Sequence, residues 1–155
     1  MLDFNKRRYI KVGAVLGSTI FLFIADRILK YWELNFLYNQ RVEIIKGWVS
    51  LDLFKNKDIA FSLPVSQFIA VPAIVLIICL LIYYFIKSAQ QGFGPREAVL
   101  LLIIFGAAGN LFDRLRYGYV IDYINFSFWP VFNLADAMIG GGTAAMIVLL
   151  LKKNK

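Results

Sequence analysis

The fold of this chain is decided between residues 68 and 86, which read FIAVPAIVLIICLLIYYFI. The stretch has no charged side chain, and its length is close to the roughly 20 residues that an α-helix needs to cross a bilayer. Three other apolar segments lie at about residues 12–29, 98–112 and 134–151. The segment at 98–112 is short, but Gly94-Pro95 can start its helix and Leu115 can extend it. The sequence therefore predicts four membrane-spanning helices.

The composition agrees with this interpretation. The chain of 155 residues is 60% hydrophobic and 17% charged, with a mean hydropathy of +0.68. A soluble domain is about 45–50% apolar and about 25% charged. We therefore expect an integral membrane protein in which residues 1–155 form a single membrane-embedded domain.

The net charge of +7 could indicate a nucleic-acid partner, but the positions of the cations argue otherwise. Basic residues open the chain at 6–8 and close it at 152–155. Clusters of this kind mark the cytoplasmic ends of membrane proteins. Lys87 and Arg96, in the connection after the second span, lie on the same side if there are four spans. We expect both termini in the cytoplasm and no nucleic acid.

The first apolar segment, with its basic start, could also be a cleaved signal peptide. No small-x-small cleavage site follows it, and charged residues come instead, at Asp26, Arg27 and Lys30. We expect a retained helix.

Short strands are predicted outside the membrane. The segment 33–64 contains alternating patches at 42–44 and 48–53, and the second external loop, 116–131, contains another at 119–121. These patches favour a small sheet lying on the membrane surface. The predicted fold class is therefore an all-α integral membrane protein with four transmembrane helices, a small extracytoplasmic β-sheet and a periplasmic-side loop.

Small and aromatic residues add two expectations. Glycine and alanine cluster at 106–109 and 140–142, and small residues let helices approach closely in lipid, so the last two helices should pack together. Aromatic side chains in and after the first span should lie at headgroup level. Those expected at headgroup level are Tyr31, Trp32, Phe36 and Trp48, whereas Phe126, Phe128 and Trp129 form the aromatic tip of the second loop.

Two aspartates, Asp122 and Asp136, stand at the foot of strongly apolar segments. A carboxylate at the edge of a bilayer is expensive to hold and usually has a function. The stretch between them is long enough for a hairpin, so the two could face one another. Carboxylates that close share one proton, which makes an acid and a base at one site. This is the chemistry of an aspartic protease.

Other catalytic chemistries are limited by composition. The chain has no histidine, so any catalytic triad or dyad with an imidazole base is excluded. Cys79 is the only cysteine, so no intramolecular disulfide can form, and with no histidine present we expect no zinc site. Chemistry by an aspartate pair requires no metal or organic cofactor. Cys79 is best interpreted as a small buried hydrophobe.

Other polar residues are predicted near the same membrane face, and each could have a structural role instead of a catalytic one. Asp26 and Lys30 are four apart on one helical face and could form an interfacial ion pair that anchors the helix end. Asn56, just before the chain re-enters the membrane, could belong to an ordinary turn.

Polar residues in the third and fourth apolar segments could also have structural roles. Asn110, Asp113 and Arg114 share one face through i, i+3, i+4 spacing, and an Asp–Arg pair that closes a helix is often structural. Asn133 could cap the fourth helix, and Asp136 could favour the positive end of its dipole. Asn110 is harder to explain this way, because an unsatisfied amide in hydrocarbon is costly.

These residues together resemble the lipoprotein signal peptidases, the signal peptidase II family of bacterial membrane aspartic proteases, over essentially the whole length. The matching motifs are Asp26–Lys30, Asn56–Phe61, Gly109–Arg114, Val120–Ile124 and Phe132–Asp136. One departure is Asp58, which stands where the family usually has glycine and could alter the shape of that loop.

The resemblance implies that Asp122 and Asp136 are the catalytic pair. It implies substrate contacts by Asn56, Asn110, Arg114 and Asn133, and structural support by Asp26, Lys30 and Asp113. The expected activity is removal of the signal peptide from a diacylglyceryl-modified prolipoprotein, before the lipidated cysteine. The expected partners are that substrate and the lipid bilayer, and the protein is expected to be a monomer. The expected location is the bacterial cytoplasmic (inner) membrane, with the active site near the outer, periplasmic face.

Three other classes of function were weighed. Intramembrane carboxylates also form proton relays in transporters, but here the charges lie near one face and the two halves of the chain are unalike. A scaffold or pore would have no use for converging Asn and Asp residues. A lipid-modifying enzyme lacks its expected carboxylate-rich signature here, and no phosphate-cradling glycine loop is visible.

Overall fold

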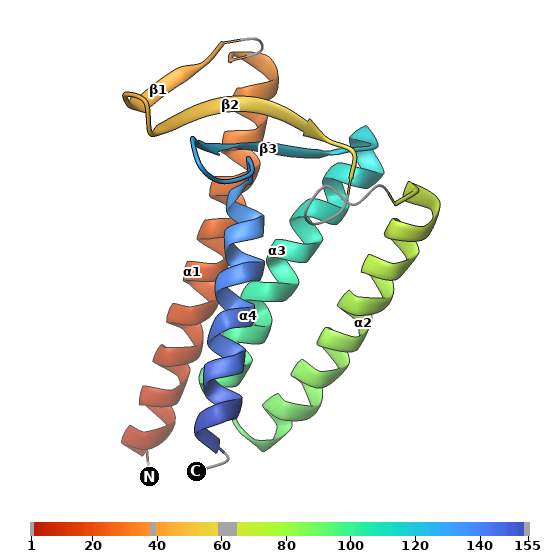
Figure 1. The fold of residues 1–155 in the computed structure, drawn as a ribbon. Helices are drawn as coiled ribbons and strands as arrows, with labels where there is room; N and C mark the ends of the chain where they lie inside the picture. Colours follow the sequence, from red (N-terminus) through yellow and green to blue (C-terminus); the bar gives the residue numbers. More distant parts are fainter. Residues whose placement is uncertain (1, 38–39, 59–64, 154–155) are drawn as a thin grey trace.

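The computed structural model describes residues 2–37, 40–58 and 65–153. Its elements, in chain order, are α1 (Leu2–Asn35), β1 (Val42–Ile45), β2 (Val49–Asn56), α2 (Gln67–Gln91), α3 (Pro95–Tyr117), β3 (Val120–Phe126) and α4 (Leu134–Lys153). The three strands lie across one end of the helices, and both termini lie at the other end (Figure 1). The predicted fold class is confirmed.

All four helices are long and apolar enough to cross a membrane, over Val12–Asn35, Gln67–Gln91, Pro95–Tyr117 and Leu134–Lys152. The four predicted spans are therefore confirmed. The first and second helices run further than predicted, to Asn35 and Gln91, and the third starts at Pro95 as expected and passes both Asp113 and Leu115, which was expected to extend it. Hydropathy falls at Lys30 and Asp113, yet the helices continue through both residues because these two side chains are buried against each other. A charge that has a partner does not end a helix.

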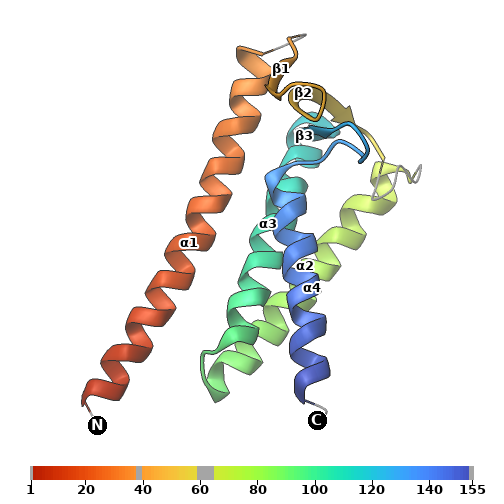
Figure 2. The ribbon, with the colours of Figure 1, turned by 60° about the vertical axis from the view of Figure 1, so that its left-hand side comes forward.

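The helices α3 and α4 pack closely, as their small residues predict. A Cβ at Gly106 would lie 2.6 Å from the backbone oxygen of Ala135, and one at Gly142 would lie 2.6 Å from Cγ1 of Ile103. Helix α3 also contacts α1 and α2, so it is the central helix of the bundle (Figure 2). This close approach places the start of α4 beside the C-terminal half of α3.

The sheet is antiparallel with strand order β1-β2-β3. Strand β2 pairs with β3 from Val49–Phe126 to Asn56–Val120, with an irregularity between Leu51 and Phe54. The strand patches predicted from alternation are confirmed, and β3 extends beyond its predicted patch. The pairing places Asn56, the last residue of β2, next to the first residues of β3.

The start of α4 is fixed by other elements. Three backbone N–H groups at this end have no partner within the helix. The N–H of Leu134 donates to Tyr123 Oη at 3.1 Å, that of Ala135 to Asp26 Oδ1 at 3.2 Å, and that of Asp136 to Asn133 Oδ1 at 2.8 Å. The first turn of α4 is thereby held against α1 and β3.

Candidate active site

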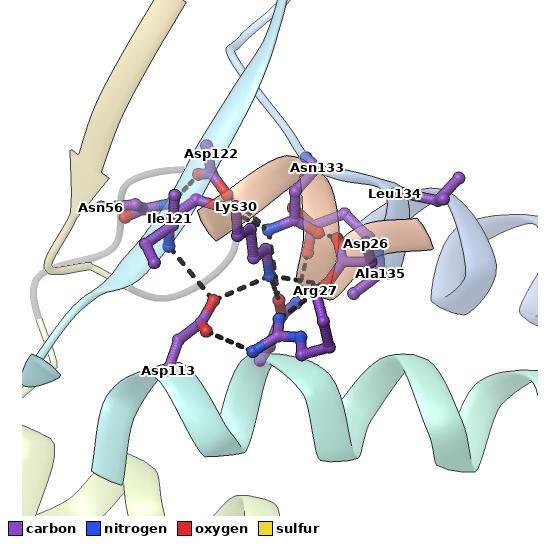
Figure 3. Close-up of polar contacts among 12 residues, drawn as sticks. Asp26, Arg27, Lys30, Asn56, Asp113, Ile121, Asp122, Asn133, Leu134 and Ala135 are labelled. Atoms are coloured by element: carbon purple, nitrogen blue, oxygen red, sulfur yellow. Dashed lines mark hydrogen bonds and ion pairs between the residues drawn. The ribbon is translucent and has the colours of Figure 1, made fainter. Parts of the chain in front are cut away.

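The nine residues singled out by sequence meet where the sheet joins the helices. Figure 3 labels six of them: Asp26, Lys30, Asn56, Asp113, Asp122 and Asn133. Helix α1 contributes Asp26 and Lys30, and α3 contributes Asn110, Asp113 and Arg114. Strands β2 and β3 contribute Asn56 and Asp122. Asn133 directly precedes α4, and Asp136 lies in its first turn. Hydrogen bonds and ion pairs connect all of them, directly or through Asp58.

Asn133 connects the two aspartates. Its side-chain Nδ2 donates to Asp122 Oδ1 at 2.6 Å, and its backbone N–H donates to Asp136 Oδ2 at 3.2 Å. Its Oδ1 accepts the N–H of Asp136, so Asn133 and Asp136 form a reciprocal cap of the capping-box kind. The capping explanation for Asn133 is therefore confirmed, and the same residue also links the two carboxylates.

Asn110 orients Asp136 from the opposite side. Its Oδ1 accepts Lys30 Nζ at 3.1 Å and Asn133 Nδ2 at 3.1 Å. Because a lysine ammonium can only donate, it fixes which end of the amide faces it. The amide NH₂ of Asn110 is then turned toward Asp136 Oδ1, at 2.7 Å.

Asp122 is buried, with 1% of its surface exposed. Asn56 Nδ2 donates to its Oδ2 at 2.9 Å, and Asn56 itself is oriented by the N–H of Asp58, which donates to its Oδ1 at 3.0 Å. Burial raises the pKa of the Asp122 carboxyl to about 7, and the negative charge of Asp136 acts in the same direction. Hydrogen bonds from Asn56 and Asn133 oppose that rise in pKa without cancelling it.

A cluster of four buried or half-buried charges lies beneath the aspartates. Lys30 Nζ lies 2.7 Å from Asp113 Oδ2 and 3.1 Å from Asp26 Oδ2. Arg27 contacts the same two carboxylates, at 2.7 Å and 2.6 Å. Two cations therefore balance two anions, the condition under which buried charges are tolerated.

This cluster corrects two of the structural roles suggested by the sequence. The pair of Asp26 and Lys30 exists, but it is buried in the protein, with 2% of Lys30 exposed, and is not an interfacial anchor. The suggested pair of Asp113 with Arg114 is wrong, because Asp113 is paired with Arg27 and Lys30. Neighbours in sequence point in different directions on a helix, and the carboxylate of Asp113 points toward α1.

Arg114 instead contacts the segment after β2. Its Nη2 donates to the backbone oxygen of Asp58 at 2.7 Å, and its buried Nη1 has no hydrogen-bond partner among the described residues. The Asn56–Phe61 motif is described only as far as Asp58, so residues 59–61 of that prediction lie outside the described residues.

Two residues of this site were not singled out by sequence reasoning. Arg27 completes the charge cluster, and its position beside Asp26 was the available signal. Tyr123 is fully buried; its hydroxyl donates to Asp26 Oδ1 at 3.2 Å and accepts the N–H of Leu134. Its position next to Asp122 in a strand places it on the opposite face, directed at α1.

A hollow of about 280 Å³ adjoins the site on the sheet side. It is lined by Phe126, Phe128, Trp129 and Phe132, and Phe132 directly precedes Asn133. An apolar surface therefore lies beside the polar one.

Four spanning helices that hold a connected set of buried carboxylates at one end define a multi-pass membrane protein with a concentrated polar site. The family model described as signal peptidase (SPase) II matches residues 18–152. The chain belongs to the signal peptidase II family, and is therefore a membrane peptidase. This membership favours the peptidase over the transporter, scaffold and lipid-modifying alternatives.

Individual proteins agree with this assignment. The lipoprotein signal peptidase of Syntrophomonas wolfei is 41% identical over 143 residues, which cover 90% of this chain and 93% of that protein. That of Halothermothrix orenii is 39% identical over 118 residues, or 76% and 80% of the two chains. A bacterial membrane enzyme solved at 2.3 Å resolution superposes with a TM-score of 0.85 at 25% identity, over 93% of this chain and 91% of the other.

Proposed function

We propose that this chain is an aspartic endopeptidase that removes the signal peptide from diacylglyceryl-modified prolipoproteins, with Asp122 and Asp136 as the catalytic pair. The cut falls before the lipidated cysteine. The observation that carries the proposal is the position of Asn133, one residue that contacts both carboxylates. The relatives named lipoprotein signal peptidases support the substrate class.

The two aspartates share one proton between them near neutral pH, and in this mechanism Asp122 holds it. Because the pKa of Asp122 is raised to about 7, this carboxyl keeps a proton that an exposed aspartic acid would lose. Asp122 then donates a hydrogen bond to the scissile carbonyl oxygen. Asp136, ionised, takes a proton from water, whose oxygen attacks the carbonyl carbon. The proton taken up by Asp136 passes to the departing amide nitrogen, which completes hydrolysis.

The remaining polar groups hold this pair and the substrate. Asn110 and Asn133 fix the carboxylates in orientation and offer amides to the substrate backbone. Asn56 and Arg114 contact the substrate from the rim, where Arg114 Nη1 has no partner among the described residues. Asp26, Lys30 and Asp113 support the site from below.

The setting suits a substrate anchored in lipid. A prolipoprotein held by its acyl chains and apolar signal helix reaches the site laterally within the membrane, so the enzyme needs no aqueous approach. The aromatic hollow beside Asn133 provides an apolar surface for the lipid-bearing part of the substrate. Both termini lie in the cytoplasm and the site near the outer face of the inner membrane, and the enzyme acts as a monomer.

The test is a gel-shift cleavage assay with a purified diacylated prolipoprotein. Asp122→Asn and Asp136→Asn are each expected to abolish cleavage, while thermal unfolding in detergent shows a folded protein. Glu43→Gln, which removes an exposed carboxylate from β1, is the matched control and should cleave normally. Full processing by either aspartate variant would contradict the aspartic mechanism.

A further inference from the structure

A second polar cluster lies between the C-terminal end of α1 and the sheet. Asp26, Lys30 and Glu33 follow i, i+4, i+7 spacing, so Glu33 shares the face of α1 that carries the charge cluster, but lies nearer the sheet. Glu33 is 1% exposed, and its Oε2 has no hydrogen-bond partner among the described residues. Within residues 2–37, 40–58 and 65–153, no cation pairs with this buried carboxylate.

The sheet presents oxygen atoms toward the same place. The Tyr123 hydroxyl reaches Asp26, so this face of β3 is directed at α1. Asn125, two residues later, shares that face by alternation, and the register pairs it with Ser50 on β2. Asp52 lies in the irregular part of β2, where strict alternation does not hold, and its contact with Asn125 places it on this face: Asn125 Nδ2 donates to Asp52 Oδ2 at 3.5 Å. Ser50, Asp52 and Asn125 therefore line the face toward α1.

The charges here are of one sign. Asp52 is the charged group that acts on Glu33 electrostatically, and both are carboxylates. The Oγ of Ser50, in a residue that is 1% exposed, also has no partner among the described residues. Buried polar groups are normally satisfied, and a buried carboxylate without a partner is strongly unfavourable. A bound cation would satisfy both the Glu33 carboxylate and the hydroxyl oxygen of Ser50.

We infer that this cluster binds a hard divalent cation of the Ca²⁺ type. The ligand atoms are the carboxylates of Glu33 and Asp52, Ser50 Oγ and the side-chain oxygen of Asn125, whose amide turns over from the orientation in which its Nδ2 donates to Asp52. Oxygen-only ligand sets select hard cations, and Ca²⁺ tolerates mixed carboxylate, hydroxyl, amide and water ligands. Asp52 is half-buried, which leaves room for water on the cation. With two carboxylates, the expected Kd is about 10⁻⁴–10⁻³ M, as in extracellular calcium modules.

The cation would join α1 to the sheet at a point separate from the catalytic pair. Strand β3 carries both Asp122 and Asn125, so a cation bound at Asn125 and Glu33 would hold the catalytic strand against α1. The expected consequence is stability of the sheet and not chemistry at the scissile bond.

The experiment uses the full chain in detergent at pH 7.5 after treatment with a chelator. Adding about 5 mM Ca²⁺ should raise Tm by about 3 °C. Tb³⁺, a luminescent Ca²⁺ substitute, should show emission sensitised by the neighbouring Trp32 and Trp48, and Ca²⁺ should displace it. Glu33→Gln should abolish both effects, as should Asp52→Asn, which alters a half-buried residue and serves if the first variant folds poorly. Glu97→Gln, a buried carboxylate at the other end of the helices, should keep both.

Two results would overturn the site. One is an unchanged Tm with Ca²⁺ and no sensitised Tb³⁺ emission from the parent protein. The other is a Tm that ignores Ca²⁺ but falls as pH rises, with that dependence lost in Glu33→Gln, since the two carboxylates would then share a proton. Asp122→Asn separates this inference from the proposed function, because it should lose cleavage and keep the Ca²⁺ effect.

Discussion

Asn133 performs two tasks with one side chain. Its Oδ1 caps α4 by accepting the N–H of Asp136, and its Nδ2 donates to Asp122. Serine can accept as a cap but cannot place an amide donor against Asp122. The two tasks can therefore be separated by substitution.

We predict that Asn133→Ser retains most of the stability and loses much of the activity. The cap survives, so Asn133→Ser should lose about 1 kcal/mol less stability than Asn133→Ala, although both variants lose the hydrogen bonds of Nδ2. The hydrogen bond to a carboxylate is lost, which at about 1.5–3 kcal/mol corresponds to at least a tenfold loss in kcat/KM. Asn133→Ala should lose both. Thermal unfolding and cleavage rates measured together test this, and equal stability losses in the two variants would contradict it.

The raised pKa of Asp122 sets a pH limit on catalysis. An acid with a raised pKa keeps its proton to higher pH, so the aspartate pair holds one proton until about pH 7. Above that pH the shared proton leaves, and we predict that kcat/KM falls about tenfold per pH unit. Asn133→Ser, which removes a hydrogen bond that lowers this pKa, should move the descending limb to higher pH. Cleavage rates from pH 5.5 to 9 measure it, and a flat profile would contradict the assignment.

Lys30 contributes to stability through burial with two anions. Lys30→Met leaves Arg27 as the one cation against Asp26 and Asp113. Breaking a buried charge balance by removing one partner costs about 3–5 kcal/mol. We therefore predict a large drop in Tm in detergent, whereas the same change at the exposed Lys57 should leave Tm nearly unchanged. Similar Tm values for the two variants would show that Lys30 is not needed for charge balance.

At the scale of the helices, the α3–α4 contact depends on one glycine more than on its neighbours. A Cβ at Gly106 would lie 2.6 Å from a backbone oxygen of α4, which cannot move aside like a side chain. We predict that Gly106→Ala destabilises the protein by about 1–3 kcal/mol. Gly140→Ala, where a Cβ meets nothing within 4 Å, is the matched control and should be neutral or slightly stabilising. Thermal unfolding of the two variants decides the point.

The sequence was informative about elements and less so about their ends. Uninterrupted hydropathy identified all four spans, because each crosses the same thickness of lipid. The predicted first span ended too early, at Leu29. Hydropathy alone does not reveal that Lys30 is paired with a buried carboxylate 83 positions away, at Asp113. The strand predicted at 119–121 occupies Val120–Phe126 in the structure. The prediction missed its second half because Asp122 and Asn125 are polar residues in a partly buried strand.

In the site, too, relations within one helix could be predicted from the sequence, whereas contacts between distant elements could not. Helical spacing placed Asn110 and Asp113 on one face, and the motif resemblance selected the nine residues that the structure brings together. Spacing could not say which helix lies opposite that face, so the sequence suggested Arg114 as the partner of Asp113 where the structure has Arg27 and Lys30. The contact from Asp26 to the first turn of α4 spans more than 100 residues and has no local signal.

At the scale of the whole molecule, the tryptophans mark a membrane boundary. Trp32, Trp48 and Trp129 are all exposed, and all lie at the sheet end. Tryptophan prefers the headgroup region. We predict that in vesicles their fluorescence is quenched by lipids carrying a quencher near the headgroup, and much less by lipids with the quencher at the end of the acyl chain. Stronger quenching by the deep probe would place the sheet inside the hydrocarbon and contradict this arrangement.

The orientation of the molecule follows from its charge. Both termini lie at the end opposite the sheet (Figure 1), and so do the end of α2, which carries Lys87, and the start of α3, which carries Arg96. Because basic residues stay cytoplasmic, the sheet and the aspartate pair should face outward. Cys79 is the one cysteine, so Cys79→Ala gives a cysteine-free chain for labelling.

In that chain, Ser127→Cys should react with a membrane-impermeant maleimide on intact cells, because Ser127 is exposed at the sheet end. Gln90→Cys, exposed at the last turn of α2, should react only after the cells are permeabilised. The opposite labelling pattern would invert the topology. It would also move the cation cluster at Glu33 to the cytoplasmic side, where free Ca²⁺ is far too scarce to fill a site of the expected affinity.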